Sequence, residues 1–194
     1  MTAGRTLAIG AAAVAAVVLV FGMLVWVPRW TTRATTTATV GAAAPAPVAA
    51  ATSGRKIKAR LFYVAEGGTK LTSVERDVAY GEGPVEQARE IISAQIAPVV
   101  EPLVSAVPPG TALRAVFVTA GGEAFVDLSR DVVSAHPGGT LGELLTVYTI
   151  VNALTENLPV VTAVQVLVDG KEMETLSGHI DLRRPLAKNL TWVQ

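Results

Sequence analysis

The distribution of hydrophobic residues divides the chain into three parts. Residues 7–27 form an unbroken apolar run of 21 residues, from Leu7 to Val27, without a charge or a proline. Residues 28–54 follow as a stretch that is mostly Ala, Thr, Pro, Val and Gly, with no apolar periodicity. Only from residue 55 do apolar and polar positions alternate as strands and helices require. We therefore expect a membrane-spanning helix, a flexible linker and one folded domain over 55–184, with short tails at 1–6 and 185–194.

The apolar run has the length of a membrane-spanning helix, which needs about 20 residues to cross the hydrocarbon core. Trp26 and Trp30 flank its far end with Arg29 between them, as is typical of a membrane–water interface. A cleaved signal peptide is the alternative, but its apolar core is usually only about 7–15 residues long. Arg5 before the run and Arg29 and Arg33 after it leave the orientation nearly balanced by charge. We expect an uncleaved single-pass anchor in the cytoplasmic membrane, with the domain outside the cytoplasm.

The first half of the domain predicts two strands and a helix. Alternating apolar and polar residues over 55–65 and 71–79 predict an antiparallel hairpin. Gly83 and Pro84 then begin a helix, because proline suits the first helical position, where no amide hydrogen is needed. An apolar stripe at helical spacing continues to residue 96.

A proline-rich loop and a second hairpin follow. Residues 101–111 include Pro108 and Gly110, which predicts a shaped loop in place of a regular element. Strands are expected over 112–119 and 123–128, and Asp127 lies near the end of the second one.

A long helix and a last hairpin complete the domain. Thr140 and Glu143, three residues apart and preceded by Gly139, have the spacing of a capping box, for which Thr140→Ala would cost about 0.5–2 kcal/mol. Residues 160–168 predict a buried strand, Asp169–Gly170 predicts a two-residue hairpin turn, and residues 171–176 are expected to return as the second strand. The element order ββαββαββ predicts an α+β fold, a two-layer sandwich of a hairpin-rich sheet and two helices.

Composition excludes several kinds of site. Residues 55–194 carry 13 basic and 16 acidic side chains, a formal charge of −3, so there is no electrostatic reason to expect nucleic acid as a partner. The chain has no cysteine, which excludes a disulfide scaffold, a thiolate zinc site and a thiol nucleophile. Its two histidines, His136 and His179, lack the spacing of metal ligands with Asp127 or Asp181. We expect no metal and no cofactor.

The residues that resemble catalytic groups have simpler structural interpretations. Ser129, Ser134 and Ser177 lie outside any nucleophile-elbow pattern, and Ser129 is expected to cap a helix. The acidic residues at four-residue spacing on the first helix are expected on its solvent-facing side; these are Glu82, Glu86 and Glu90. Residues 138–140 could present backbone amides to an anion, although a helix cap explains them equally well. We expect that the protein is not an enzyme.

Seven short motifs occur in order along the domain. They are Tyr80–Pro84, Val107–Thr111, Val126–Ser129, His136–Thr140, Val147–Thr155, Val168–Lys171 and Leu176–His179. Together they resemble the GerMN domain of the sporulation and spore germination family, over about residues 58–182.

This resemblance implies a non-catalytic domain that faces the cell envelope. The best-known member of the family is a lipoprotein with two such domains in tandem, which helps to assemble a channel complex between mother cell and forespore. The present chain has one copy of the domain and no cysteine that could be lipidated.

The sequence leaves three functional hypotheses. The first is a membrane-anchored domain that binds an envelope protein as part of an assembly. An exposed sheet edge could add a strand of the partner, and Lys56, Lys58 and Arg60 indicate where charge protects one edge. The second is an envelope module that recognises peptidoglycan or a small anionic compound. The third is a hydrolase that depends on Ser129 or His136.

Overall fold

The computed structural model describes residues 54–194. The expected membrane-spanning helix over 7–27, the tail before it and the linker up to residue 53 lie outside these residues. Within the described part, no helix is both long and apolar enough to cross a bilayer.

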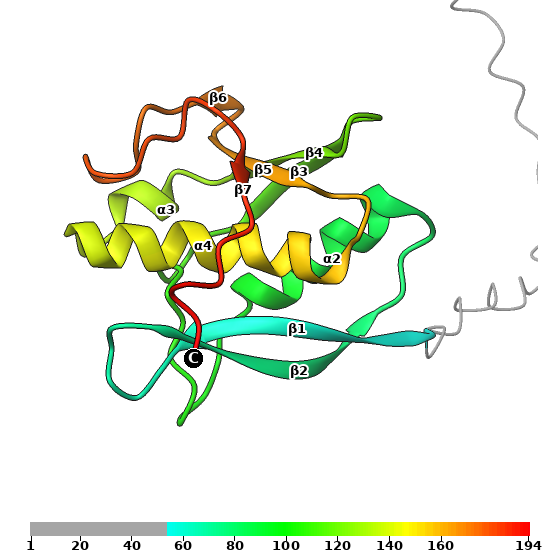
Figure 1. Ribbon diagram of the computed structural model, residues 1–194, viewed down its shortest axis with the longest axis horizontal. Helices are drawn as coiled ribbons and strands as arrows, with labels where there is room; N and C mark the ends of the chain where they lie inside the picture. The colour runs from blue at the N-terminus through cyan, green and yellow to red at the C-terminus, as the bar shows by residue number, and fades with distance from the viewer. Residues whose placement is uncertain (1–53) are drawn as a thin grey trace, which may run out of the picture. The chain divides into compact units, whose positions relative to one another are not determined.

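The described residues form two sheets and three helices (Figure 1). Their bounds are β1 Lys56–Val64, β2 Leu71–Ala79, α2 Pro84–Ile96, β3 Leu113–Val118, β4 Glu123–Leu128, α3 Asp131–Ser134, α4 Thr140–Asn157, β5 Ala163–Val168, β6 Lys171–Glu172 and β7 Leu186–Ala187. Most expected elements are therefore present within a few residues of their predicted ends. The two-residue β7 was not predicted, and the single-turn α3 was predicted only through the helix cap expected at Ser129.

The first sheet is the hairpin β1–β2, which is antiparallel from Lys56 opposite Ala79 to Val64 opposite Leu71. One face of the hairpin is apolar and packs into the core, as the alternation predicted: Ala59, Leu61 and Tyr63 are buried. Phe62, on the opposite face, is buried as well.

The second sheet has the strand order β3-β4-β5-β6, and β7 also pairs with β5. β3 and β4 are antiparallel, whereas β4 and β5 are parallel, because α4 carries the chain back to the same end of the sheet. The turn between β5 and β6 has positive φ at both Asp169 (51°) and Gly170 (74°), which matches the predicted two-residue hairpin turn.

The helices lie between the two sheets, and this arrangement corrects the predicted two-layer sandwich. Figure 1 shows α2 and α4 with the hairpin β1–β2 on one side and β3, β4 and β5 on the other. The physical reason is visible in α4, where consecutive residues from Leu145 to Thr155 are almost all buried, with Tyr148 only partly so. A helix that is buried all round must be covered on more than one side. The α+β class is confirmed, and the sheet is divided in two.

The last hairpin and the chain end also differ from expectation. Only Lys171–Glu172 return beside β5, where a strand to residue 176 was predicted. The predicted tail over 185–194 contributes β7 to the second sheet, and its end pairs with β2. Leu71 donates its amide to the Trp192 carbonyl at 2.7 Å and accepts the amide of Gln194 at 2.9 Å. The C-terminal segment therefore joins both sheets.

The start of α2 agrees with the sequence. Pro84 is its first residue, and Gly83 precedes it with φ of 90°, a conformation that glycine adopts without strain. Glu82 and Glu86 are exposed and Glu90 is half-buried, as expected for the outer side of this helix.

Candidate functional site

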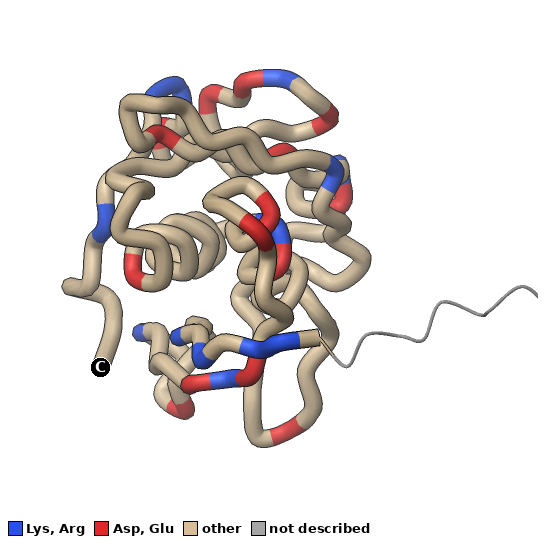
Figure 2. The backbone as a smooth tube through the Cα atoms, turned by 90° about the vertical axis from the view of Figure 1, so that its right-hand side faces the viewer, with Lys and Arg blue, Asp and Glu red and all other residues tan. Residues whose placement is uncertain are grey.

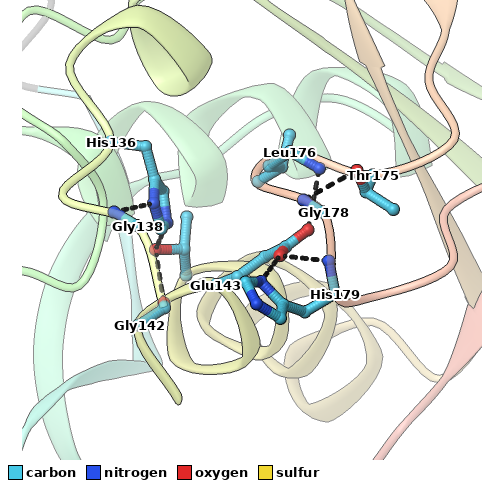
Figure 3. Close-up of polar contacts among 9 residues, drawn as sticks. His136, Gly138, Gly142, Glu143, Thr175, Leu176, Gly178 and His179 are labelled. Atoms are coloured by element: carbon cyan, nitrogen blue, oxygen red, sulfur yellow. Dashed lines mark hydrogen bonds and ion pairs between the residues drawn. The ribbon is translucent and has the colours of Figure 1, made fainter. Parts of the chain in front are cut away.

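A buried carboxylate, that of Glu143, lies in the first turn of α4. Glu143 is fully buried, and its two oxygens accept hydrogen bonds from the backbone amides of Leu176 at 2.8 Å and His179 at 2.9 Å. The His179 ring is also in contact, with Nδ1 3.2 Å from Oε2 of Glu143. Figure 3 shows how the 175–179 loop folds over the helix and presents these groups to the carboxylate. Glu143 therefore fixes this loop to α4.

The predicted capping box is wrong. Gly139, with φ of 82°, occupies the cap position, and Thr140 is the first helical residue, exposed and without a capping hydrogen bond. Glu143 turns toward the loop instead of reaching back to the cap, because the loop supplies amides that need an acceptor in the interior. The sequence pattern was correct about the position of the helix start and incorrect about its chemistry.

His136 is held by a chain of hydrogen bonds beside this carboxylate (Figure 3). The Gly138 amide donates to Nδ1 of His136 at 2.9 Å, so the ring proton lies on Nε2, which is 3.2 Å from Oγ1 of Thr146. The Thr146 hydroxyl is in turn 2.6 Å from the Ala106 carbonyl, to which it donates. Both ring nitrogens of His136 are therefore occupied within the fold.

The electrostatics of the cluster favour a structural role. Burial opposes ionisation of Glu143, but backbone amides of the 176–180 loop outweigh it and hold the pKa below its ordinary value. Burial lowers the pKa of His136, although the charge of Glu143 and a backbone hydrogen bond near Gly142 partly oppose the shift. The carboxylate stays ionised and the imidazole neutral near pH 7. Neither group has the pKa shift expected of a general acid or base at neutral pH.

The residues of the hydrolase hypothesis do not form a catalytic arrangement. The Ser129 hydroxyl donates to Asp131 at 2.8 Å and accepts the Ala112 amide at 3.0 Å, so it links a strand to a turn. It is not a helix cap as predicted, since α3 begins at Asp131 without a side-chain cap. No hydrogen bond in the structure joins Ser129 to His136. Across residues 54–194, no three His, Asp or Glu side chains are grouped in a way that could hold a metal ion.

The remaining predicted turn residues gather at the C-terminal end of β4. Asp127 is buried, accepts the Gly170 amide at 2.7 Å through Oδ1, and faces Arg114 Nε at 3.1 Å through Oδ2. Arg114 also lies 3.5 Å from Asp169. These contacts hold the β5–β6 turn against the strand, which agrees with the structural interpretation of Asp127, Asp169 and Gly170.

The sequence did not identify two side-chain amides, one buried and one half-buried, that take the place of a strand partner. The carboxamide of Gln95, in α2, bonds both the amide and the carbonyl of Phe62 at 2.8 Å. Asn157, at the end of α4, does the same for Arg60, again at 2.8 Å. In the sequence, the only sign of this role is that Gln95 is a polar residue on the apolar face of α2, together with residues such as Ile91. Together the two amides close the outer edge of β1.

The proline-rich loop forms an apolar groove of about 480 Å³. Its lining runs from Ile96, at the end of α2, to Thr111 and includes the predicted positions Pro108 and Gly110. Val104 contributes a side chain that is 55% exposed, and neighbouring Val100 is 84% exposed. The loop is fixed to the hairpin, since the Val64 amide donates to the Val104 carbonyl at 2.8 Å. The fold therefore keeps the apolar side chains of Val100 and Val104 exposed to solvent.

The polar groups of the groove are already paired. None of the described residues that line it carries a charge. Its two hydroxyl side chains bond to the loop itself: Ser105 bonds to Val107, and Thr111 donates to the Pro108 carbonyl at 2.8 Å. The groove offers an apolar surface with few free polar groups to orient a small anion.

A smaller hollow of about 200 Å³ lies beside His179, between Glu174 and Arg183. The Arg183 guanidinium is committed to Asp181, with two hydrogen bonds of 2.9 and 2.8 Å, and it holds the pKa of that carboxyl below its usual range. The positive charge of Arg183 beside this hollow is therefore neutralised by Asp181.

Comparison with known proteins identifies the domain. The family model described as sporulation and spore germination (Germane) matches residues 60–174, more than half of the chain. No curated protein matches the sequence. This family is not a known enzyme family.

Three solved structures are similar to this chain at low sequence identity. The tandem GerMN domains of the sporulation protein GerM from Bacillus subtilis match at 15% identity and a TM-score of 0.50, over 70% of this chain and 46% of that one. The chain therefore spans about half of that tandem structure. The first GerMN domain alone matches at 16% identity and a TM-score of 0.48, over 68% and 97% of the two chains. A Clostridium perfringens protein assigned as a lipoprotein matches at 20% identity and a TM-score of 0.49, over 69% and 88%.

Proposed function

The chain belongs to the sporulation and spore germination family, and we propose that its GerMN-type domain is a non-catalytic binding module of the cell envelope. In this proposal the apolar run over 7–27 anchors the chain in the cytoplasmic membrane, and the domain binds another envelope protein on the outer side. The composition of the linker and the length of the apolar run support the anchoring.

The observation that carries this proposal is the apolar groove over residues 96–111. Exposed apolar side chains held in a fixed loop favour a protein partner, because burying them on association removes apolar surface from water. Val100 and Val104 would be the first side chains to be buried. The scarcity of free polar groups in the groove argues against the alternative, a site for peptidoglycan or a small anionic compound.

The experiment that tests the proposal is capture of tagged full-length protein after crosslinking in living cells. We compare the wild type with Val104→Asp, in the groove, and with Val160→Asp, at a position of nearly equal exposure (54%) outside it. The proposal predicts that an envelope protein is recovered with the wild type and with Val160→Asp, and is lost with Val104→Asp. Equal recovery of the envelope protein with all three forms would contradict binding at the groove. Recovery of wall fragments alone would favour the ligand-binding alternative.

A further inference from the structure

Two edges of the hairpin sheet are protected against pairing with another strand. The outer edge of β1 is closed by Gln95 and Asn157, whose amides take the hydrogen bonds of Phe62 and Arg60. The outer edge of β2 is closed at Leu71 by the C-terminal residues, and further along it carries exposed charges. Figure 2 shows these charges as alternating red and blue segments on the hairpin. Charged side chains on an edge strand discourage pairing with other chains.

The outer edge of β3 has neither form of protection beyond Arg114. β3 pairs with β4 alone among the described residues, so its other edge has no strand neighbour. The Thr119 amide donates to the Glu123 carbonyl at 2.9 Å, which fixes which residues of β3 face β4. Hydrogen-bonded and non-hydrogen-bonded positions alternate along an antiparallel pair. The backbone N–H and C=O groups of Ala115 and Phe117 therefore point toward β4, whereas those of Val116 and Val118 point away from it, toward the open edge.

The side chains along this edge are uncharged from Ala115 onward. Residues 115–122 contain no charge. Phe117 is 59% exposed and lies opposite Phe125 of β4, which is itself only half-buried. Val116, by contrast, points into the core and is buried. Beyond Arg114, β3 is an uncharged edge strand with an exposed aromatic side chain, which is a surface on which another strand can pair.

We propose that a second copy of this chain pairs its β3 with this edge, antiparallel and centred on Phe117. In this register Val116 of each copy lies opposite Val118 of the other, and each such pair exchanges both of its backbone hydrogen bonds. The two Phe117 side chains meet on the same face at the closely spaced, non-hydrogen-bonded position. The arrangement has twofold symmetry, so it closes as a dimer and joins the two second sheets into one.

Charge selects a second copy as the occupant. Residues 55–194 carry a net charge of −3, so two copies can approach closely only where acidic side chains do not face each other. Self-pairing of β2 would bring the carboxylates around Glu75 and Asp77 close to those of the other copy. Self-pairing of β3 brings no acidic side chains together, and its one charged residue, Arg114, falls opposite the uncharged Ala120 of the other copy. Anchoring in one membrane would raise the effective concentration and favour even a small interface.

The absence of cysteine from the chain allows a direct test by disulfide crosslinking. Full-length Phe117→Cys is oxidised in membranes, because the opposed α-carbons at a non-hydrogen-bonded pair, about 4.5 Å apart, lie within disulfide range. Thr69→Cys, exposed in the turn of the other sheet, is the control. We expect a disulfide-linked dimer with Phe117→Cys and none with Thr69→Cys. Equal crosslinking by both variants, or a Phe117→Cys adduct with a different protein, would overturn the proposal.

A second measurement keeps the aromatic contact intact. Ala115→Cys and Thr119→Cys, expressed together, should crosslink to each other, since these positions are opposed in the proposed register. Sedimentation of the full chain in detergent should show a dimer that is lost with Phe117→Lys, whose circular dichroism stays that of the wild type. A wild-type chain that sediments only as a monomer, or a dimer that persists with Phe117→Lys, would overturn the proposal. Val104→Asp should leave the dimer unchanged, so failure of the groove and failure of this interface are distinguishable.

Discussion

Replacement of Glu143 with alanine should be among the most destabilising single changes in the domain. The side chain is fully buried, and its removal leaves the amides of Leu176 and His179 without their acceptor. Each buried donor left unpaired costs about 1–3 kcal/mol, so Glu143→Ala should lower the free energy of unfolding by about 2–6 kcal/mol. With a urea slope of about 1–3 kcal/mol per molar, the unfolding midpoint should fall by about 2 M.

The assay is urea unfolding of residues 54–194, which contain their own hydrophobic core, followed by far-ultraviolet circular dichroism. Thr140→Ala is the matched control three residues away, since the Thr140 side chain is exposed and makes no capping bond. We expect its midpoint to stay close to the wild-type value. A Glu143→Ala midpoint that also stays there, or a Thr140→Ala midpoint that falls by as much, would refute the assignment of these two residues.

The same carboxylate predicts a pH dependence. Because the folded state holds the pKa of Glu143 below its ordinary value of 4.5, ionisation stabilises the fold at all pH values above about 4.5. This contribution is lost as the pH falls below 4.5 toward the pKa of the folded state. Glu143→Gln cannot titrate, so its unfolding free energy should change less than that of the wild type over this acidic range. An equal pH dependence in the two forms would show that Glu143 is not the group responsible.

Three further predictions concern other parts of the fold. Gln95→Leu should lower the unfolding free energy by about 2–4 kcal/mol in urea titrations, because both backbone groups of Phe62 lose their partner, whereas Ser93→Ala on the exposed side of α2 should not. Gly122→Ala should lower the melting temperature, since φ is 86° and an added Cβ would lie 2.8 Å from the Val160 carbonyl; an unchanged melting temperature would contradict this close approach. The pKa of His136 should lie below 6.5 when followed by nuclear magnetic resonance, because burial disfavours the charged ring, and a value above 6.5 would mean that burial does not dominate over the charge of Glu143.

The helices and strands could be predicted because local patterns determine them. Pro84 after a glycine, the alternation along 56–64, and Asp169–Gly170 in a hairpin turn each depend on neighbouring residues only. These features gave the α+β class and most element ends.

The layer arrangement and the site chemistry could not be predicted in the same way because they depend on contacts distant in sequence. Glu143 has the spacing of a capping residue, and only the 176–179 loop, more than 30 positions later, supplies the amides that it binds. Gln95 likewise stands out in the sequence only as a polar residue on an apolar helix face, and its role as a partner of Phe62 depends on β1, which lies more than 30 positions earlier. The two short pairings of the C-terminal segment also carry no local signal.

The central claim is that the groove binds an envelope protein, and photocrosslinking in living cells tests it most directly. A photoreactive amino acid replaces Val104 in the full-length chain, and in a second strain it replaces Val160 as the control. The account predicts a covalent adduct with one envelope protein from position 104 and no such adduct from position 160. The absence of an adduct at position 104, or the same adduct from both positions, would contradict it.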